Sequence, residues 1–310
     1  MRVLVTGGSG FIGSHVLDKL VAAGHEPVNF DLLRSPHHNG EVEWVEGSLL
    51  DPEQVRAALR GCDAVIHLAA WADVDLVIQD PTSAGAVNVR GTQVILDAAR
   101  AEGIKRVVYG STVWVYDKAV GEGALDEDTP LGLPSHFYTA TKLAGEMYCR
   151  SYGELYGQEH TILRFGIPYG PRSRPTAVVA AFVAKALRGE ALTIAGDGSQ
   201  SRRFVYVEDL AEGVVAGLAP EAANRIYNLV SPDSVTIRMV AETVQEIVGE
   251  VELVQVEGRK GDLAPAEISG ARAAAELGWR PETPFAEGVR RYVDWVRASD
   301  QAKPEPVGPR

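Results

Sequence analysis

The hydrophobic positions of the chain form short apolar runs that alternate with stretches of helical periodicity. The apolar runs predict strands at residues 2–5, 26–30, 42–45, 64–68, 106–109 and 160–165. The periodic stretches between them predict helices at residues 11–21, 52–59, 82–101 and 137–156. Repeated strand–helix units give a parallel sheet with helices on both faces. We therefore expect an α/β fold built on a doubly wound parallel sheet.

The regular alternation stops after Phe165. Residues 166–175 contain three prolines and predict a structured loop, and strand and helix patterns then return without strict order. We expect a first domain of residues 1–165, completed by about 204–230, and a smaller C-terminal α/β domain of residues 166–203 and 231–300. The smaller domain would close over the carboxyl ends of the strands, and residues 301–310 would form a loose tail.

The composition narrows the classes of function. The chain has 30 basic and 42 acidic residues and a net charge of −12, with no basic run, which argues against a nucleic-acid partner. No apolar stretch approaches the roughly 20 residues that span a bilayer, and Met1 leads directly into the first strand, so we expect no membrane partner, no signal peptide and a cytoplasmic location. Cys62 and Cys149 form neither a disulfide framework nor a metal-binding cluster, so we expect no metal.

A glycine-rich turn joins the first strand to the first helix. Gly7, Gly10 and Gly13 lie three residues apart there. In this setting the first glycine permits a tight turn, the second lets a pyrophosphate approach the backbone, and the third lets helix and strand pack closely. Asp31 ends the second strand, where a carboxylate accepts hydrogen bonds from ribose hydroxyls and repels a 2′-phosphate. The pattern predicts a dinucleotide site that prefers NAD to NADP, and nearby Arg34 is the one feature that favours NADP.

Tyr138 and Lys142 are four residues apart in a predicted helix and therefore share one face. A free phenol has a pKa of about 10, and a neighbouring ammonium lowers it toward the value that a general base needs. Ser111 and Thr112 follow the strand at 106–109 and place hydroxyls at its carboxyl end. We expect Thr112 to steady the reacting oxygen, and we expect Ser111 only to bond its own backbone in a turn.

Together these motifs resemble the extended short-chain dehydrogenase/reductase family over about residues 1–298. Within it, the chain looks like the NAD-dependent nucleotide-sugar epimerases and dehydratases. The residues that carry the resemblance are Thr6 to Gly13, Asp31, His67 to Ala70, Asn88 to Thr92, Ser111, Thr112, Tyr138, Lys142 and Tyr169 to Arg172.

The resemblance implies roles for individual residues. Tyr138 would be the catalytic base and acid, Lys142 would hold the nicotinamide ribose, and Thr112 would be the third member of the triad. The implied cofactor-binding residues are Gly7, Gly10, Phe11, Ile12, Gly13, Asp31, Leu32, Leu49, Leu68, Ala69, Ala70, Tyr138 and Lys142. One expected contact to adenine is weakened, because Ser48 stands where relatives often carry an aspartate.

The residues after Thr112 bear on the reaction. Dehydratases of this family carry one or two acids there, because elimination needs an additional acid and base. Here Val113 and Trp114 follow, which disfavours dehydration and decarboxylation. We predict an NAD-dependent 4-epimerase of a nucleotide sugar, a UDP-hexose or UDP-hexuronate, that acts through a transient 4-keto intermediate. The alternatives are a 4-keto-sugar reductase or other sugar-nucleotide dehydrogenase, and a non-catalytic NAD(P)-sensing protein.

The resemblance also implies substrate contacts and an assembly. Thr112 and Tyr138 would contact the sugar, and Arg172, Arg202 and Arg259 would bind its diphosphate through their planar guanidinium groups. Three positions depart from the family pattern and leave the sugar and nucleobase open, namely Ile167, Ala195 and Arg203. The helices at 82–101 and 137–156 resemble those that pair in family dimers, so we expect a homodimer.

Overall fold

The computed structural model describes residues 1–38, 40, 42–117, 119, 123–257 and 267–301. The chain divides into two compact units. The first unit consists of Met1–Gly166, Glu208–Pro232 and Ala266–Arg280, and the second consists of Ile167–Val207, Asp233–Pro265 and Pro281–Arg310.

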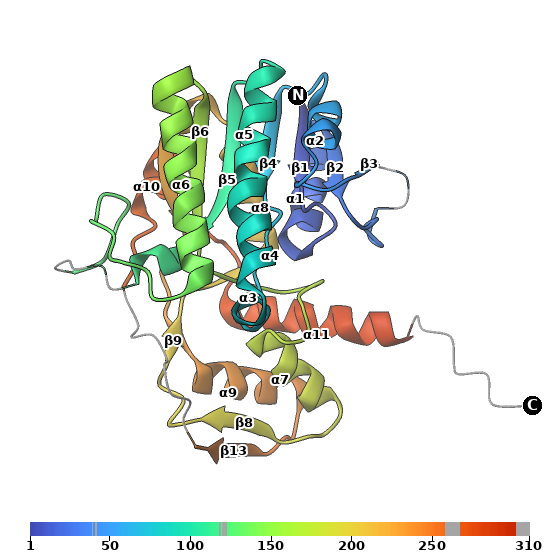
Figure 1. The fold of residues 1–310 in the computed structure, drawn as a ribbon. Coiled ribbons are helices and arrows are strands. Elements are labelled where there is room, and N and C mark those ends of the chain that lie inside the picture. Colours follow the sequence, from blue (N-terminus) through green and yellow to red (C-terminus); the bar gives the residue numbers. More distant parts are fainter. Residues whose placement is uncertain (39, 41, 118, 120–122, 258–266, 302–310) are drawn as a thin grey trace, which may run out of the picture. The chain divides into compact units, whose positions relative to one another are not determined.

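The first unit is built on a seven-stranded sheet in the order β11-β6-β5-β4-β1-β2-β3 (Figure 1). Every neighbouring pair of strands in it is parallel. Its strands are β1 (Arg2–Thr6), β2 (Glu26–Asp31), β3 (Glu43–Glu46), β4 (Ala64–His67), β5 (Arg106–Thr112), β6 (Glu159–Phe165) and β11 (Arg225–Leu229). The central strands are buried on both faces, as in β1, where Val3, Leu4 and Val5 are each 0% exposed. This explains why the sequence shows them as continuous apolar runs.

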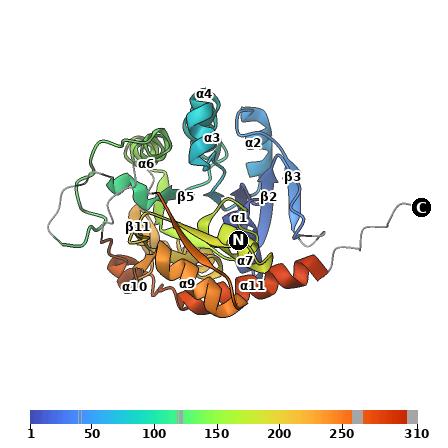
Figure 2. The same cartoon turned by 90° about the horizontal axis from the view of Figure 1, so that it is seen from below.

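Helices cover both faces of this sheet (Figure 2). On one face α2, α5 and α6 pack in a row (Figure 1), and on the other α1 is joined to α8 by an ion pair of 2.6 Å between Lys19 and Glu212. The helical elements that belong to this unit wholly or mainly are α1 (Phe11–Ala22), α2 (Pro52–Leu59), α3 (Val74–Gln79), α4 (Pro81–Gly85), η1 (Ala86–Arg90), α5 (Gly91–Ala101), η2 (Val113–Tyr116), α6 (Phe137–Tyr156), α8 (Val207–Ala216), η3 (Pro220–Ala222) and α10 (Ala271–Glu276). The predicted doubly wound parallel sheet is confirmed.

The helix expected over residues 82–101 is present but not uniform. It begins at Pro81, which suits the first helical position, and the Asp80 carboxylate caps it by accepting the Ser83 N–H at 3.0 Å. Residues 86–90 form a π-helical turn, η1, before the α-helix resumes as α5. The sequence pattern gave no signal for this turn or for the short helix α3 that precedes it.

Strand β5 is longer than the apolar run at 106–109 predicts. It continues through Gly110 to Thr112, so Ser111 and Thr112 pair in register with Arg164 and Phe165 of β6. A β-carbon at Gly110 would stand 2.9 Å from Leu68 Cδ2 and 3.1 Å from the Phe165 ring, so a larger residue there would force these side chains to shift. The two hydroxyls are therefore held by the sheet and not by a loop.

The second unit combines helices with three two-stranded sheets. In these sheets β7 pairs with β10, β8 with β13, and β9 with β12. Its elements are β7 (Ile167–Tyr169), α7 (Val178–Leu187), β8 (Leu192–Ala195), β9 (Ser201–Arg202), β10 (Phe204–Tyr206), β12 (Val235–Thr236), α9 (Ile237–Val248), β13 (Leu253–Val256) and α11 (Phe285–Gln301). Residues 166–175 were expected to form a structured loop, but they contain β7, which pairs with β10 and whose Ile167 N–H donates to Arg203 O at 2.9 Å.

In the second unit, side chains from α7, α9 and α11 form one apolar core with the strands. Val183, Leu192, Val240, Val244 and Val289 are each 0% exposed in that core. Among the described residues of both units, no helix is long and apolar enough to cross a membrane.

The close approach of α6 to β5 depends on Gly145. A β-carbon there would lie 2.1 Å from the hydroxyl oxygen of Tyr109, a ring that is only 1% exposed. We expect Gly145→Ala to destabilise the protein by about 1–3 kcal/mol through overpacking. The matched control is Gly85→Ala, whose β-carbon meets Phe137 at an ordinary 3.6 Å and should be neutral or slightly stabilising. Thermal unfolding of both variants checks this, and equal melting temperatures would contradict it.

Candidate active site

The residues predicted to bind the dinucleotide lie at one edge of the sheet. Gly7 to Gly13 follow β1, Asp31 and Leu32 end or follow β2, Leu49 follows β3, and Leu68 to Ala70 follow β4. These four strands are neighbours and parallel, so their carboxyl ends meet at the same edge. Ligands of open parallel sheets bind at that edge.

The glycine turn is held by steric constraints that differ among its members. Gly7 has a positive φ of 72°, and a β-carbon there would lie 2.8 Å from the backbone of Ala69. A β-carbon on Gly13 would lie 2.1 Å from Gly7 O. At Gly10 the only atom within 4 Å of an added β-carbon, in the part of the chain that the structure describes, is Gly7 O at 3.2 Å. Gly7 and Gly13 are therefore required by the fold, whereas Gly10 leaves space beside the backbone.

The N-terminus of α1 suits an anionic ligand. Its first residues are Phe11, Ile12 and Gly13, and its N-cap is Gly10. In the described structure no side chain caps this terminus, and no acidic residue lies in its first turn. Its N–H groups and the positive end of the helix dipole can therefore bind a pyrophosphate, and the space at Gly10 lets that group approach the backbone.

Asp31 is fixed beside this turn. Its two carboxylate oxygens accept the N–H groups of Ser9 at 3.1 Å and Leu33 at 3.2 Å. Ser9 Oγ in turn donates to Leu33 O at 2.5 Å, which ties the turn after β2 to the glycine turn. The Arg34 guanidinium lies 5.9 Å over the ring of Trp44. The carboxylate is therefore presented at the strand end, where the sequence predicts a ribose contact.

Helix α6 and strand β5 bring the three predicted catalytic residues into one region. Lys142 is buried and donates from Nζ to Gly110 O at 2.8 Å, two residues before Thr112. Tyr138 lies one helical turn before Lys142 and is half-buried. Its ring meets Trp114, two residues after Thr112, edge to face at 6.2 Å. The structure thus brings Thr112, Tyr138 and Lys142 together at the β5 end of the sheet edge.

The turn expected at Ser111 occurs one residue later. Thr112 Oγ1 accepts the N–H of Trp114 at 3.2 Å and caps η2. Ser111 does not bond its own backbone in this way, because it lies inside β5 and its hydroxyl donates to Glu146 Oε1 at 2.5 Å. The expectation for Ser111 was therefore wrong.

Burial lowers the pKa of Lys142. Desolvation lowers the pKa of its ammonium to about 8, while the negative charge of Glu146 opposes that shift. The lysine is therefore cationic at neutral pH but close to its titration range. A cation held one turn from Tyr138 favours the phenolate form of that residue.

A buried polar network lies between the glycine turn and α6. His67 Nδ1 is 2.7 Å from Thr6 Oγ1 and its Nε2 is 3.0 Å from Thr92 Oγ1. Because Thr92 donates to Asn88 O at 2.7 Å, we assign the His67 proton to Nε2. Burial and nearby Lys142 lower the His67 pKa to about 3, which agrees with a neutral ring.

Asn88 extends this network to the catalytic helix. Its amide donates to Trp71 O at 3.0 Å and to Thr141 Oγ1 at 3.1 Å, and it accepts the N–H of Trp71 at 2.8 Å. Thr141 Oγ1 donates to Tyr138 O at 2.7 Å. The loop after β4 and the first turn of α6 are thus joined through one side chain.

Sequence reasoning missed several residues around the triad. His136 packs against Trp114 at 6.1 Å, so Trp114 lies between His136 and Tyr138. Glu146 is 1% exposed and forms an ion pair of 2.8 Å with Arg164. The position of Glu146, four residues after Lys142, was the signal that could have revealed it.

The predicted substrate arginines belong to the second unit or lie outside the described residues. Arg172 follows β7 with a positive φ of 66°. Arg202 lies in β9 and donates from Nη1 to Ser201 O at 2.8 Å. Arg259, with the adjacent Gly261 and Asp262, lies outside the described residues, so its predicted role stays a prediction.

The fold agrees with comparisons to known proteins. The model of the NAD dependent epimerase/dehydratase family matches residues 3–229. That is more than half of the chain, and the chain therefore belongs to the NAD-dependent epimerase/dehydratase family. It is an enzyme of that family, as its sequence motifs predicted.

Solved structures and curated relatives are similar to this chain over nearly its whole length. The UDP-glucose 4-epimerase of Thermotoga maritima, solved with UDP-glucose, is 31% identical with a TM-score of 0.91, covering 96% of this chain and 99% of that one. The UDP-glucose 4-epimerase of Thermus thermophilus, in complex with NAD, is 35% identical with a TM-score of 0.88, covering 96% and 100%. The dTDP-glucose 4,6-dehydratase of Streptomyces antibioticus is 32% identical over 328 residues, covering 100% of this chain and 97% of the relative.

The cofactor follows from the family and agrees with the local geometry. NAD is the cofactor of this chain, as Asp31 and the glycine turn predicted. The comparisons divide, however, between epimerases and a dehydratase at similar identity, so they do not select the reaction.

The glycine turn gives a test that separates folding from cofactor binding. We expect Gly10→Ala to fold, because its φ of −78° suits alanine, but with a modest loss of stability, because the added β-carbon would lie 3.2 Å from Gly7 O. We expect NAD to bind at least about tenfold more weakly, because the methyl group occupies the approach to the helix N-terminus. Calorimetric titration with NAD measures the affinity, and Gly85→Ala is the control. Unchanged affinity would remove Gly10 from the cofactor site.

Proposed function

We propose that the protein is an NAD-dependent 4-epimerase of a nucleotide sugar, with a UDP-hexose or UDP-hexuronate as substrate. The observation that carries this proposal is the arrangement of Thr112 on β5 with Tyr138 and Lys142 on α6, beside two non-acidic residues, Val113 and Trp114. This arrangement supplies one tuned acid–base group and no second carboxylate directly after Thr112.

The triad residues divide the work of proton transfer. Tyr138 removes the proton of the sugar 4-hydroxyl and later returns it, because its phenol is the titratable group one turn from a buried cation. Lys142 keeps the phenolate accessible and contacts the nicotinamide ribose. Thr112 donates a hydrogen bond that steadies the reacting oxygen. Bound NAD would supply the hydride acceptor and donor that inversion at the sugar C4 carbon requires.

The identity of the residues after Thr112 argues for epimerisation over dehydration. Val113 is 7% exposed and apolar, and Trp114 packs between His136 and Tyr138. Neither side chain can act as the acid or base that elimination requires at the carbons next to C4. Trp114 instead gives the Tyr138 phenol an apolar neighbour, and we propose that it borders the sugar.

We assign the nucleotide diphosphate to arginines of the second unit, which would act as the substrate-binding domain. Arg172, Arg202 and Arg259 supply guanidinium groups that suit a diphosphate. Among the UDP-sugars, UDP-glucose is our first candidate. The departures at Ile167, Ala195 and Arg203 are reasons to test UDP-glucuronate beside it.

The proposal is tested by incubating the purified protein with UDP-glucose or UDP-glucuronate without added cofactor. We expect formation of the corresponding 4-epimer and near-stoichiometric NAD(H) in the purified protein, because an epimerase regenerates bound cofactor in every cycle. Tyr138→Phe should lower turnover at least about a thousandfold, because the variant lacks the group that acts as general base in the oxidation step and as general acid in the reduction step. The matched control is Tyr156→Phe, which removes a hydroxyl from the exposed end of the same helix.

Other outcomes identify the rival functions. Reduction of a 4-keto sugar that depends on added cofactor would indicate a reductase, and loss of water from a dTDP- or UDP-hexose would indicate a dehydratase. Undiminished turnover in Tyr138→Phe would contradict the mechanism. NAD binding without turnover of any nucleotide sugar would favour the sensing protein.

We also propose a homodimer formed through α5 and α6. These helices pack against each other on one face of the sheet, and Met147, Leu155 and Tyr156 of α6 are 44%, 71% and 54% exposed. A second copy would bury these apolar groups in a helix bundle. Light scattering should give a mass twice that of one 33.3 kDa chain, and Met147→Arg should lower the measured mass toward that of one chain. A wild-type mass of one chain would contradict the dimer.

A further inference from the structure

Three residues of α6 form a stripe that faces β5. Tyr138, Lys142 and Glu146 follow one another at four-residue spacing and therefore lie on one face of the helix. Lys142 is 5% exposed and Glu146 is 1% exposed. The stripe thus carries a phenol, an ammonium and a carboxylate in successive turns, and only the first two have a role in the reaction described above.

The end of β5 is bonded to this stripe at two consecutive residues. Gly110 O accepts from Lys142 Nζ at 2.8 Å, and Ser111 Oγ donates to Glu146 Oε1 at 2.5 Å. The next residue of the strand is Thr112. Two polar contacts, one helical turn apart on α6, therefore fix the backbone that carries the Thr112 hydroxyl.

Glu146 is itself held in place by Arg164. Arg164 donates from Nε to Oε1 at 3.1 Å and from Nη2 to Oε2 at 2.8 Å, which is the two-pronged geometry that orients a carboxylate. Arg164 is paired in register with Ser111 across β5 and β6. Its Nη1 donates to the Tyr116 hydroxyl at 2.8 Å, and that hydroxyl donates to Asn228 Oδ1 at 2.9 Å.

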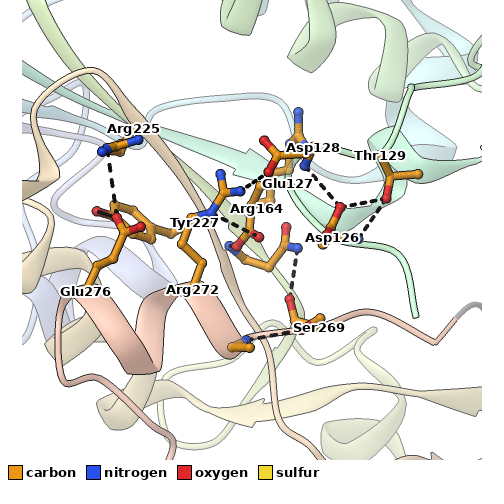
Figure 3. A network of polar contacts seen from close by, with 12 residues as sticks. Asp126, Glu127, Asp128, Thr129, Arg164, Arg225, Tyr227, Ser269, Arg272 and Glu276 are labelled. Carbon is orange, nitrogen blue, oxygen red and sulfur yellow. Dashed lines mark hydrogen bonds and ion pairs between the residues drawn. The ribbon is translucent and has the colours of Figure 1, made fainter. Parts of the chain in front are cut away.

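The same chain of contacts continues to the surface of the first unit (Figure 3). Asn228 N–H donates to Glu127 Oε1 at 2.7 Å, and Glu127 Oε2 lies 3.7 Å from Arg272 Nε. Arg272 also pairs with Asp128. Figure 3 shows Arg272 of α10 directed toward Glu127 and Asp128 of the segment at 126–129. Two neutral residues, Tyr116 and Asn228, thus link the buried pair of Glu146 and Arg164 to a second charged group formed by Glu127, Arg272 and Asp128.

A buried ion pair of this kind is a poor source of stability. Desolvating two charges costs about as much as their attraction returns, and well-packed apolar residues would serve the core equally well. If apolar residues replaced Glu146 and Arg164, the hydrogen bond from Ser111 to Glu146 would be lost. The geometry therefore points to orientation of the strand end as the property that this pair supplies.

We propose that Ser111 and Glu146 are positioning residues for the reaction, and that Glu146, gripped by Arg164, sets the placement of Thr112 relative to Tyr138. Neither residue touches the substrate in this proposal. It rests on the proposed function only in that Tyr138 and Thr112 act together on a substrate hydroxyl.

The first test uses Ser111→Ala, which keeps the ion pair of Glu146 and Arg164 intact. We expect kcat to fall about tenfold or more with KM and NAD affinity nearly unchanged, because a small displacement of a reacting group costs rate and not binding. Ser111→Thr, which keeps a hydroxyl, should restore most of kcat.

The matched control is Thr161→Val. Thr161 lies on β6 three residues before Arg164 and is 0% exposed, and its hydroxyl shares one proton between Gly217 O at 3.0 Å and Ala222 O at 2.8 Å. We expect both variants to melt at lower temperature, and only Ser111→Ala to lose kcat. Equal kcat in wild type and Ser111→Ala would overturn the proposal, as would an equal loss in the control.

The second test is the pH dependence of Glu146→Gln. Titratable and charged groups lie around Lys142 on each neighbouring element: Tyr109 on β5, His67 on β4, and Tyr138, Glu146 and Cys149 on α6. The Glu146 charge raises the Lys142 pKa, so its removal should lower that pKa. Because the reaction needs cationic Lys142, the alkaline limb of the kcat profile should move to lower pH. A folded variant with an unmoved limb and a wild-type kcat would contradict the role of Glu146, because displacement of Thr112 should also lower kcat.

Crystal structures of the NAD-loaded wild type and Ser111→Ala provide a readout that needs no substrate. We expect Gly110 to Thr112 to move relative to α6 in the variant, and an unchanged distance between Thr112 Oγ1 and the Tyr138 hydroxyl would overturn the proposal. Failure of the proposed function gives a different result, because the wild type would then turn over no nucleotide sugar. The two crystal structures would still show whether Ser111 positions Thr112.

Discussion

The candidate active site depends on the burial of the Lys142 ammonium between α6 and β5. Its Nζ lies 2.8 Å from Gly110 O, and desolvation brings its pKa to about 8. A cation placed there has two consequences. It anchors the catalytic helix to the strand that carries Thr112, and it favours ionisation of the phenol one turn away. The glycine at position 145 permits this arrangement, because a larger residue would push the helix off Tyr109.

The cofactor edge of the sheet follows from a different constraint. Parallel strands buried on both faces bring the turns after β1, β2, β3 and β4 to one edge, and the glycine turn leaves a helix N-terminus there without a side-chain cap among the described residues. Hydrogen bonds through His67 and Asn88 join this edge to the start of α6. The predicted dinucleotide site and the candidate acid–base residues of α6 are thus joined by one continuous set of buried contacts.

Much of this could be predicted from the sequence because its signals are local. The apolar runs, the glycine spacing, Asp31, and the four-residue spacing of Tyr138 and Lys142 each depend on residues near one another in the chain. The contacts of Ser111 were not predictable in this way. Glu146 lies 35 residues after Ser111, and their meeting depends on how far β5 extends and on its register with Arg164 of β6.

The second unit was harder to predict for the same reason. Several of its strands have only two to four residues, which is too short for a period of two to show. Their pairing, such as β7 with β10 across more than thirty residues, is set by the tertiary fold. The left-handed backbone of Arg172 is likewise invisible in sequence.

The central claim is that the Tyr138 phenol ionises near neutral pH because the Lys142 ammonium, together with the positive charge that an oxidised nicotinamide would supply, favours its phenolate form. Ultraviolet difference titration of NAD-loaded wild type against NAD-loaded Tyr138→Phe isolates that single phenol. The account predicts ionisation well below the ordinary phenol pKa of about 10. A Tyr138 that titrates at or above that value in the NAD-loaded protein would contradict it.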